Sequence, residues 1–236
     1  MRRRSSSKTD TLIYSWVRRT GSYTGEELPT PEMQNAVKEA IKSFKKYAEF
    51  RKKLCDIARS FAPFLVCTGD DIPDSGWVCP IDDDDWHSPN IESVLLGQPK
   101  DVDVVWWNIS SIRWVKPAFF DPLWMFSSRN VPGTCSYAFR CRIFKNISET
   151  DFKLLMDDHV FVPIHATRLG LKVVHTPLVG GVWNVTPLSV SILQEFGNRV
   201  PTAEEIDIDR ILQWPNIPDW IARGIGPIAT LIKEYI

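Results

Sequence analysis

Four consecutive aspartates, Asp82 to Asp85, are the residues of this chain best suited to chemistry. They directly follow residues 77–81, an apolar segment with the length and composition of a buried strand. Adjacent carboxylates repel one another, so a run of this kind is usually a solvated loop. Here apolar residues return at once, at Trp86 and Ile91. We therefore expect the acids to be held at a strand end, at the mouth of a core.

A bound cation would relieve the repulsion within this run. Hard divalent cations take oxygen ligands, typically one or two protein carboxylates together with phosphate oxygens of a substrate. The run therefore favours a metal that clamps a diphosphate. An acidic turn without any ligand is the competing interpretation.

A second acidic pair, Asp157 and Asp158, lies at another junction of predicted elements. The pattern predicts that the pair begins a helix, that Gly170 ends it and that a strand follows. Acids in the first turn of a helix are favoured by its dipole, so capping alone would explain the pair. Two acidic clusters, each at a junction, also suit a metal site with a general base.

Apolar periodicity places these acids in an α/β sheet domain, because helical segments interleave with short apolar strands. The expected strands are residues 11–17, 64–68, 77–81 and 102–107, and the expected helices are residues 32–61, as one or two helices, and 90–96. Basic residues within 38–53 are expected on the solvent-exposed face of a helix. In open α/β sheets chemistry gathers at the carboxyl ends of strands, where the aspartates lie.

Length and composition limit the number of domains and the class of protein. A chain of 236 residues with 44% hydrophobic content can form one domain, or at most two small ones. A net charge of -1 gives no field that would attract nucleic acid or an anionic membrane. Five cysteines without C-x-x-C spacing support neither a zinc site nor a disulfide framework. Without an apolar span or a secretory signal, we expect a soluble, cytoplasmic protein.

Residues 81–86, followed by Pro89, resemble the apolar-Asp-x-Asp-Asp motif of inverting glycosyltransferases with the A-type fold. The resemblance is to the large family that includes cellulose-synthase-like and rhamnosyl-transferring enzymes. In that motif the acids bind the divalent metal and the nucleotide-sugar diphosphate. Residues 132–144 are similar to the acceptor-side strand of the family. Asp157 and Asp158 fall where the family carries a Glu-Asp pair, whose Asp deprotonates the acceptor hydroxyl.

The resemblance implies the glycosyltransferase A-type fold, an α/β fold with a mixed central sheet flanked by helices. It implies a single glycosyltransferase domain at 10–236, while the arginines and serines of residues 1–9 themselves predict a disordered basic tail. That domain would comprise a nucleotide-sugar half, an acceptor half and C-terminal helices, at residues 10–100, 101–200 and 201–236. The enzyme would transfer a sugar from a UDP-, GDP- or dTDP-sugar to a glycan hydroxyl, with inversion, in glycan biosynthesis.

The site residues follow from the same resemblance. Asp158, or else Asp157, would be the catalytic base. Mn²⁺ or Mg²⁺ would be held by Asp82, Asp84, Asp85 and His175. The nucleotide would contact Tyr14, Arg18, Asp82, Asp83 and Asp84.

The chain departs from the family pattern in several places, among them Pro163, which interrupts the helix one residue out of step with the family's spacing to Gly170. Asp157 replaces the usual Glu, and the usual Asp-Gly-Ser strand is not visible in the first 75 residues. Two alternatives therefore stay open: a non-catalytic module on the same fold that binds nucleotide sugar or glycan, and a metal-dependent nucleotide hydrolase. The hydrolase should show a Gly-rich phosphate loop or a His-rich site, and neither is present.

Two further segments carry expectations. Gly180 and Gly181 predict a loop over the acceptor site. Residues 202–236 read as helical, with breaks at three prolines, Pro215, Pro218 and Pro227. Their apolar side chains would cover the sheet, or would form a surface for a partner or for peripheral contact with lipid headgroups.

Overall fold

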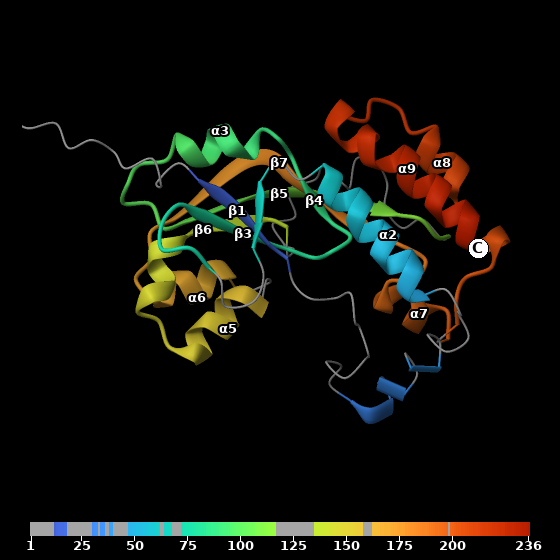
Figure 1. Ribbon diagram of the computed structural model, residues 1–236, viewed down its shortest axis with the longest axis horizontal. Helices are drawn as coiled ribbons and strands as arrows, with labels where there is room; N and C mark the ends of the chain where they lie inside the picture. The colour runs from blue at the N-terminus through green and yellow to red at the C-terminus, as the bar shows by residue number, and fades with distance from the viewer. Residues whose placement is uncertain are drawn as a thin grey trace, which may run out of the picture.

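The computed structural model describes residues 12–17, 30–32, 34–35, 38–39, 47–61, 64–67, 72–116, 135–157, 162–197 and 199–236. In this part of the chain a single mixed sheet runs through the molecule, with helices on both of its faces and a further group of helices at one end (Figure 1). An α/β fold with a mixed sheet flanked by helices is therefore confirmed.

The sheet has seven strands among the described residues. Their order is β2 (Leu65–Cys67), β1 (Ile13–Val17), β3 (Trp77–Ile81), β6 (Tyr137–Arg140), β5 (Val104–Arg113), β7 (Val173–Val185) and β4 (Trp86–His87). Strands β1, β2, β3, β5 and β7 run in one direction, and β6 and β4 run against them.

Helices cover the two sheet faces unequally. The described helices are α2 (Tyr47–Ser60), α3 (Ile91–Leu96), α5 (Glu149–Asp157), α6 (Val162–Arg168), α7 (Val190–Glu195), α8 (Ile208–Leu212) and α9 (Asp219–Tyr235), with 3-10 turns η2 (Cys141–Lys145) and η3 (Ala203–Glu205). Helix α3 lies on one face and α5 and α6 lie on the other, while α2, α7, α8 and α9 gather at one end (Figure 1).

Strand β5 shows why both faces are covered. Val104 and Trp106 pack into the cluster under α5 and α6, while Val105 and Trp107 pack into the cluster under α3. Successive side chains of a strand point to opposite faces, so a continuous apolar run needs cover on both sides. The fold supplies that cover with helices.

The C-terminal helices complete the core. In α9, Ile221, Ile225 and Ile228 are buried in the cluster that also holds Phe50 and Leu54 of α2. These apolar side chains therefore serve the core. The predicted break at Pro227 is wrong, because α9 continues through this exposed proline while its other face stays buried. No helix of the described chain is both long and apolar enough to cross a bilayer.

The predicted glycine loop is also wrong, because Gly180 and Gly181 lie inside strand β7. A Cβ on Gly180 would meet the side chains of Ile91 and Trp107 at 2.4 and 2.5 Å. A Cβ on Gly181 would meet the carbonyl oxygen of Cys135 at 2.3 Å. Both glycines are therefore needed for close packing, and neither marks a turn.

Candidate functional site

The ends of β1 and β3 form a topological switch point. Strand β1 lies between β2 and β3. After β1 the chain forms β2 on one side of it and then β3 on the other side. The two strands are parallel, and their last residues, Val17 and Ile81, are in register. Open α/β sheets bind ligands in the crevice outside the carboxyl ends of strands at such a point. The acidic turn, residues 82–85, begins directly there.

Within the acidic turn, exposure alternates along the chain. Asp82 is half-buried, and the side chain of Asp84 is 12% exposed. The Asp83 side chain is only 3% exposed, and Asp85 is fully buried. The turn is closed by the backbone N–H of Asp85, which donates to the Asp82 carbonyl at 3.2 Å. Asp82 and Asp84 are therefore the carboxylates nearest to solvent.

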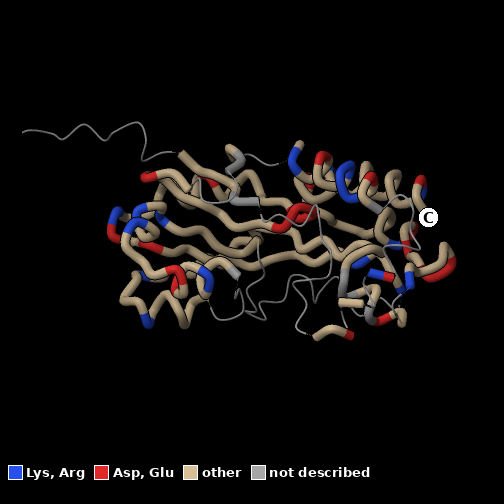
Figure 2. Tube along the Cα trace, turned by 60° about the horizontal axis from the view of Figure 1, so that its bottom comes forward, with Lys and Arg blue, Asp and Glu red and all other residues tan. Residues whose placement is uncertain are grey.

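Two arginines of α2 neutralise and shape this turn. Arg51 donates to Oδ1 of Asp83 and, at 3.0 Å, to Oδ2 of Asp84. Arg59 donates to the backbone carbonyls of Asp82, at 3.2 Å, and Asp85. The prediction that the basic residues of 38–53 lie on a solvent-exposed helix face is wrong for Arg51, which is buried against the acids. In Figure 2 the acidic turn is the long red stretch near the centre of the molecule.

Asn184 of β7 holds the other side of the acidic turn. Its backbone N–H donates to Oδ1 of Asp85 at 2.9 Å, and its Nδ2 donates to the Asp84 carbonyl at 3.1 Å. Its Oδ1 accepts from Nε1 of Trp114 at 2.7 Å. Sequence reasoning missed Asn184, Arg51 and Arg59, because only the long-range packing shows that they meet the acids.

Burial sets the electrostatics of the carboxyls. Burial raises the pKa of Asp84 to about 6, although Arg51 opposes the rise. Burial, followed by the charges of Asp84 and Asp82, also raises the pKa of Asp85 well above its usual range. Oδ2 of Asp83 is buried without a hydrogen-bond partner. Burial and the Asp85 carboxyl raise the pKa of the neighbouring Cys135 thiol as well.

The donor set fits a hard divalent cation. Hard divalent cations take carboxylate oxygens as ligands, and Asp82 and Asp84 are the two carboxyl groups of the turn that lie nearest to solvent. Among the described residues no group of three or more metal-ligating side chains occurs. A cation here would therefore rest on Asp82 and Asp84 together with ligand or water oxygens, because Asp85 is turned to Asn184.

His87 is a buried polar residue next to this turn. Its ring lies 5.7 Å from Phe64 and 5.9 Å from Trp107, measured between ring centroids. Neither ring nitrogen has a hydrogen-bond partner. Burial, followed by the charge of Arg59, lowers the pKa of His87 to about 3. The imidazole is therefore neutral at pH 7.

The structure does not bring His175 to the acidic turn. His175 stacks on Trp106, with ring centroids 4.0 Å apart, and its Nε2 lies 3.3 Å from Oδ1 of Asn108. It precedes Asn184 by about nine residues of the same strand, which is on the order of 30 Å. Tyr14 packs in the cluster under α5 and α6, and Arg18 lies outside the described residues.

The second acidic pair is placed only in part. Asp157 is the last residue of α5, so the expectation that it begins a helix is wrong. The next helix begins at Val162, and Gly170 follows it with a φ of 73°, as the predicted helix end requires. Asp158 lies outside the described residues.

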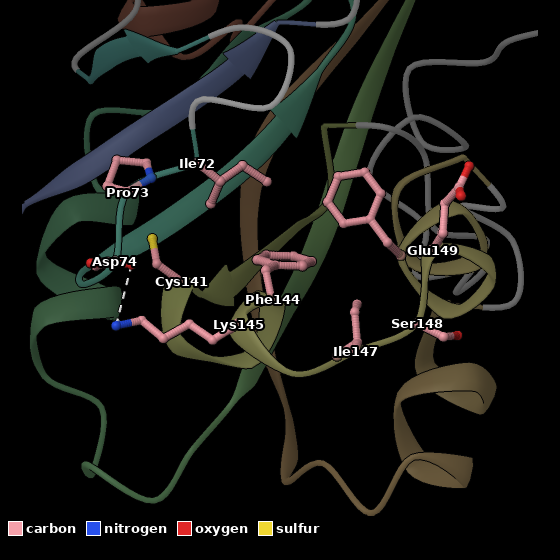
Figure 3. A pocket seen from close by; sticks show the side chains of 10 residues that line it. Ile72, Pro73, Asp74, Cys141, Phe144, Lys145, Ile147, Ser148 and Glu149 are labelled. Atoms are coloured by element: carbon pink, nitrogen blue, oxygen red, sulfur yellow. Dashed lines mark ion pairs between the residues drawn. The ribbon is translucent and has the colours of Figure 1, made fainter.

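A cavity of about 370 Å³ lies at the opposite edge of the sheet (Figure 3). Phe144, Ile72 and Ile147 line it, and Lys145 pairs with Asp74 at 3.2 Å across its rim. Its lining residues precede β3 or follow β6, so the length of β3, roughly 17 Å, separates it from the acidic turn. The cavity is not part of the site at the switch point.

Comparison of the chain with known protein families, with curated proteins and with solved structures gives no match. The features that bear on function are therefore those of the chain itself: the switch point at the ends of β1 and β3, and the two carboxylates of the acidic turn nearest to solvent.

Proposed function

We propose that this chain is a metal-dependent inverting glycosyltransferase that uses a nucleoside-diphosphate sugar. The observation that supports it best is the position of the acidic turn at the carboxyl end of β3, in register with the end of β1. The carboxyl ends of strands at such a switch point are where open α/β sheets bind ligands. The resemblance of residues 81–86 to the apolar-Asp-x-Asp-Asp motif agrees with that position.

Each residue of the acidic turn has a role in this proposal. Asp82 and Asp84 would hold Mn²⁺ or Mg²⁺, because their carboxylates lie nearest to solvent. The cation would balance the charge of the diphosphate. Asp83 and Asp85 would fix the turn from inside, through Arg51 and Asn184. The protein thereby presents two carboxylates at a defined edge of the sheet.

The acceptor side requires a base. We assign this role to Asp158, with Asp157 at the end of α5 as the alternative. The base takes the proton of the acceptor hydroxyl while the hydroxyl oxygen attacks the anomeric carbon, opposite the departing diphosphate. A single displacement inverts the configuration at that carbon. The donor would be a UDP-, GDP- or dTDP-sugar and the acceptor a glycan hydroxyl, with Arg18 at the nucleobase.

Donor hydrolysis tests this proposal. Purified protein is incubated with a panel of UDP-, GDP- and dTDP-sugars, with and without Mn²⁺ or Mg²⁺, and the products are identified. We expect slow, metal-dependent release of free sugar and nucleoside diphosphate from one donor, and loss of that release in Asp84→Ala. Release of inorganic phosphate from the nucleotide would instead identify a nucleotide hydrolase.

One observation favours a second candidate, a non-catalytic module that binds nucleotide sugar. Arg51 already pairs with both Asp83 and Asp84, as expected if the acids stabilise the fold without a metal. The variant Asp158→Asn separates the two functions. Loss of turnover with donor binding retained supports the transferase, whereas donor binding without turnover in the wild-type protein supports the module.

A further inference from the structure

Arg51 pairs with Asp84, one of the two carboxylates that the proposed metal would use, and with the neighbouring Asp83. Its Nη1 donates to Oδ2 of Asp84 at 3.0 Å, and its Nη2 donates to Oδ1 of Asp83. The side chains of Arg51 and Asp83 are 8% and 3% exposed. Burial strengthens such contacts, because little water screens the charges. Asp84 therefore already has a counter-ion in the absence of metal.

The two aspartates that Arg51 contacts differ in their exposure to solvent. Asp83 is turned inward, whereas Asp84 retains more exposure. A divalent cation that approaches from solvent would therefore meet Asp84 before Asp83. The guanidinium can release Asp84 and keep its contact with Asp83, because each carboxylate uses a different nitrogen of the fork.

The backbone that carries Arg51 is firmly anchored. The neighbouring Phe50 is fully buried and contacts Tyr235 of α9 edge to face, with ring centroids 5.6 Å apart. Lys53 pairs with Glu234 of α9 at 3.0 Å. The positive charge of Arg51 therefore remains near the acidic turn whether or not Asp84 is occupied.

We propose that Arg51 is the resident counter-ion of the metal site, and that divalent-cation binding exchanges the guanidinium for the metal at Asp84 while Asp83 keeps Arg51 in place. The inference rests on the proposed function, since it concerns the same metal site. Arg51 is thus a positioning residue that orders the acidic turn when no cation is bound and weakens the affinity of the turn for cations.

The direction of an affinity change tests this exchange. Mn²⁺ binding is measured without nucleotide, by electron paramagnetic resonance of the free ion, in wild-type protein, Arg51→Gln and Arg51→Lys. Removing a positive charge a few ångströms from a dication should tighten binding about tenfold or more in Arg51→Gln. Arg51→Lys keeps the charge and should stay near wild type.

The matched control is Arg142→Gln. Arg142 also pairs with an aspartate, Asp103, but that pair lies beside the amino end of β5, at the opposite edge of the sheet. Its loss changes the net charge equally and should leave Mn²⁺ affinity unchanged. If Arg51 only stabilised the turn and did not exchange with the metal, Arg51→Gln should bind Mn²⁺ more weakly than wild type, because a disordered turn binds cations more weakly.

A second measurement is made on the wild-type protein, and Arg51→Lys serves only to assign one resonance. Titration of the wild-type protein with Mg²⁺ should shift the Arg51 side-chain Nε–H resonance, assigned by its absence in Arg51→Lys, in a saturable manner. Equal or weaker Mn²⁺ binding in Arg51→Gln, an unshifted Arg51 resonance at Mg²⁺ saturation, or no cation binding at all would overturn the exchange. Donor hydrolysis tests the proposed function independently of this exchange, because it measures sugar release and does not depend on the position of Arg51.

Discussion

Asn184 donates its backbone N–H to Oδ1 of Asp85 at 2.9 Å, although 99 residues separate them in the chain. The acidic turn leads from β3 into β4, and β4 pairs with the second half of β7, which carries Asn184. The turn is therefore fixed between α2 on one side and β7 on the other. The geometry of the carboxylates thus depends on strands and helices from distant parts of the sequence.

The variant Asn184→Ala should destabilise the protein. It removes the donor to the Asp84 carbonyl and leaves Nε1 of Trp114 without its acceptor inside the core. Buried groups left unsatisfied cost about 1–3 kcal/mol each, so for these two groups we expect a loss of roughly 2–6 kcal/mol in the free energy of unfolding. Urea denaturation measures it. The control is Asn108→Ala, whose exposed side chain donates to Pro177, and a loss as large there would contradict this account.

His87 should make stability depend on pH. Its pKa is about 3 in the folded protein, against an ordinary value of 6.5, so unfolding takes up a proton between those two values. The contribution of the neutral His87 to the free energy of unfolding is fully present above pH 6.5. Below that pH it is lost by about 1.4 kcal/mol for each pH unit, down to the folded-state pKa. His87→Phe, which keeps a ring between Phe64 and Trp107, should be increasingly more stable than wild type from pH 7.5 to pH 5. A stability difference that is constant over this range, measured by urea denaturation, would show that His87 does not stay neutral.

The packing of α9 on Trp86 is tested by two glycines of the same helix. A Cβ on Gly224 would lie 2.7 Å from Cζ2 of the buried Trp86 ring. Gly224→Ala should therefore cost about 1–3 kcal/mol through overpacking, measured by thermal unfolding. A Cβ on Gly226 meets nothing within 4 Å. Gly226→Ala should change stability by less than about 1 kcal/mol, because better helix propensity opposes crowding against Pro227. Equal effects of the two variants would rule out this helix packing.

Local patterns were sufficient for the strands around the site. The apolar segment at residues 77–81 is strand β3, and the predicted helix at 90–96 is α3. These elements are short and strongly patterned, so burial and turn residues alone define them. The acidic turn could likewise be placed at a strand end, because apolar residues flank it on both sides.

The contacts of the acidic turn could not be predicted from local patterns. Arg51 looks like any other basic residue of an amphipathic helix, and only the packing of α2 on α9 directs it to the acids. Gly180 and Gly181 suggested a loop because a glycine required for close approach has the same local signal as one in a turn. Asp157 does not begin a helix, because it belongs to α5, which already begins at Glu149.

The most direct test of the account is the Mn²⁺-dependent binding of UDP, GDP and dTDP, measured by calorimetry on wild-type protein and on the double variant Asp82→Asn/Asp84→Asn. The control is Asp101→Asn, at an exposed ion pair beside the amino end of β5. The account predicts that wild type and the control bind one of the nucleotides in the presence of Mn²⁺, and that the double variant binds it at least about a hundredfold more weakly. Equal affinity in the double variant, or no nucleotide binding by the wild-type protein, would contradict the assignment of this edge of the sheet as the donor site.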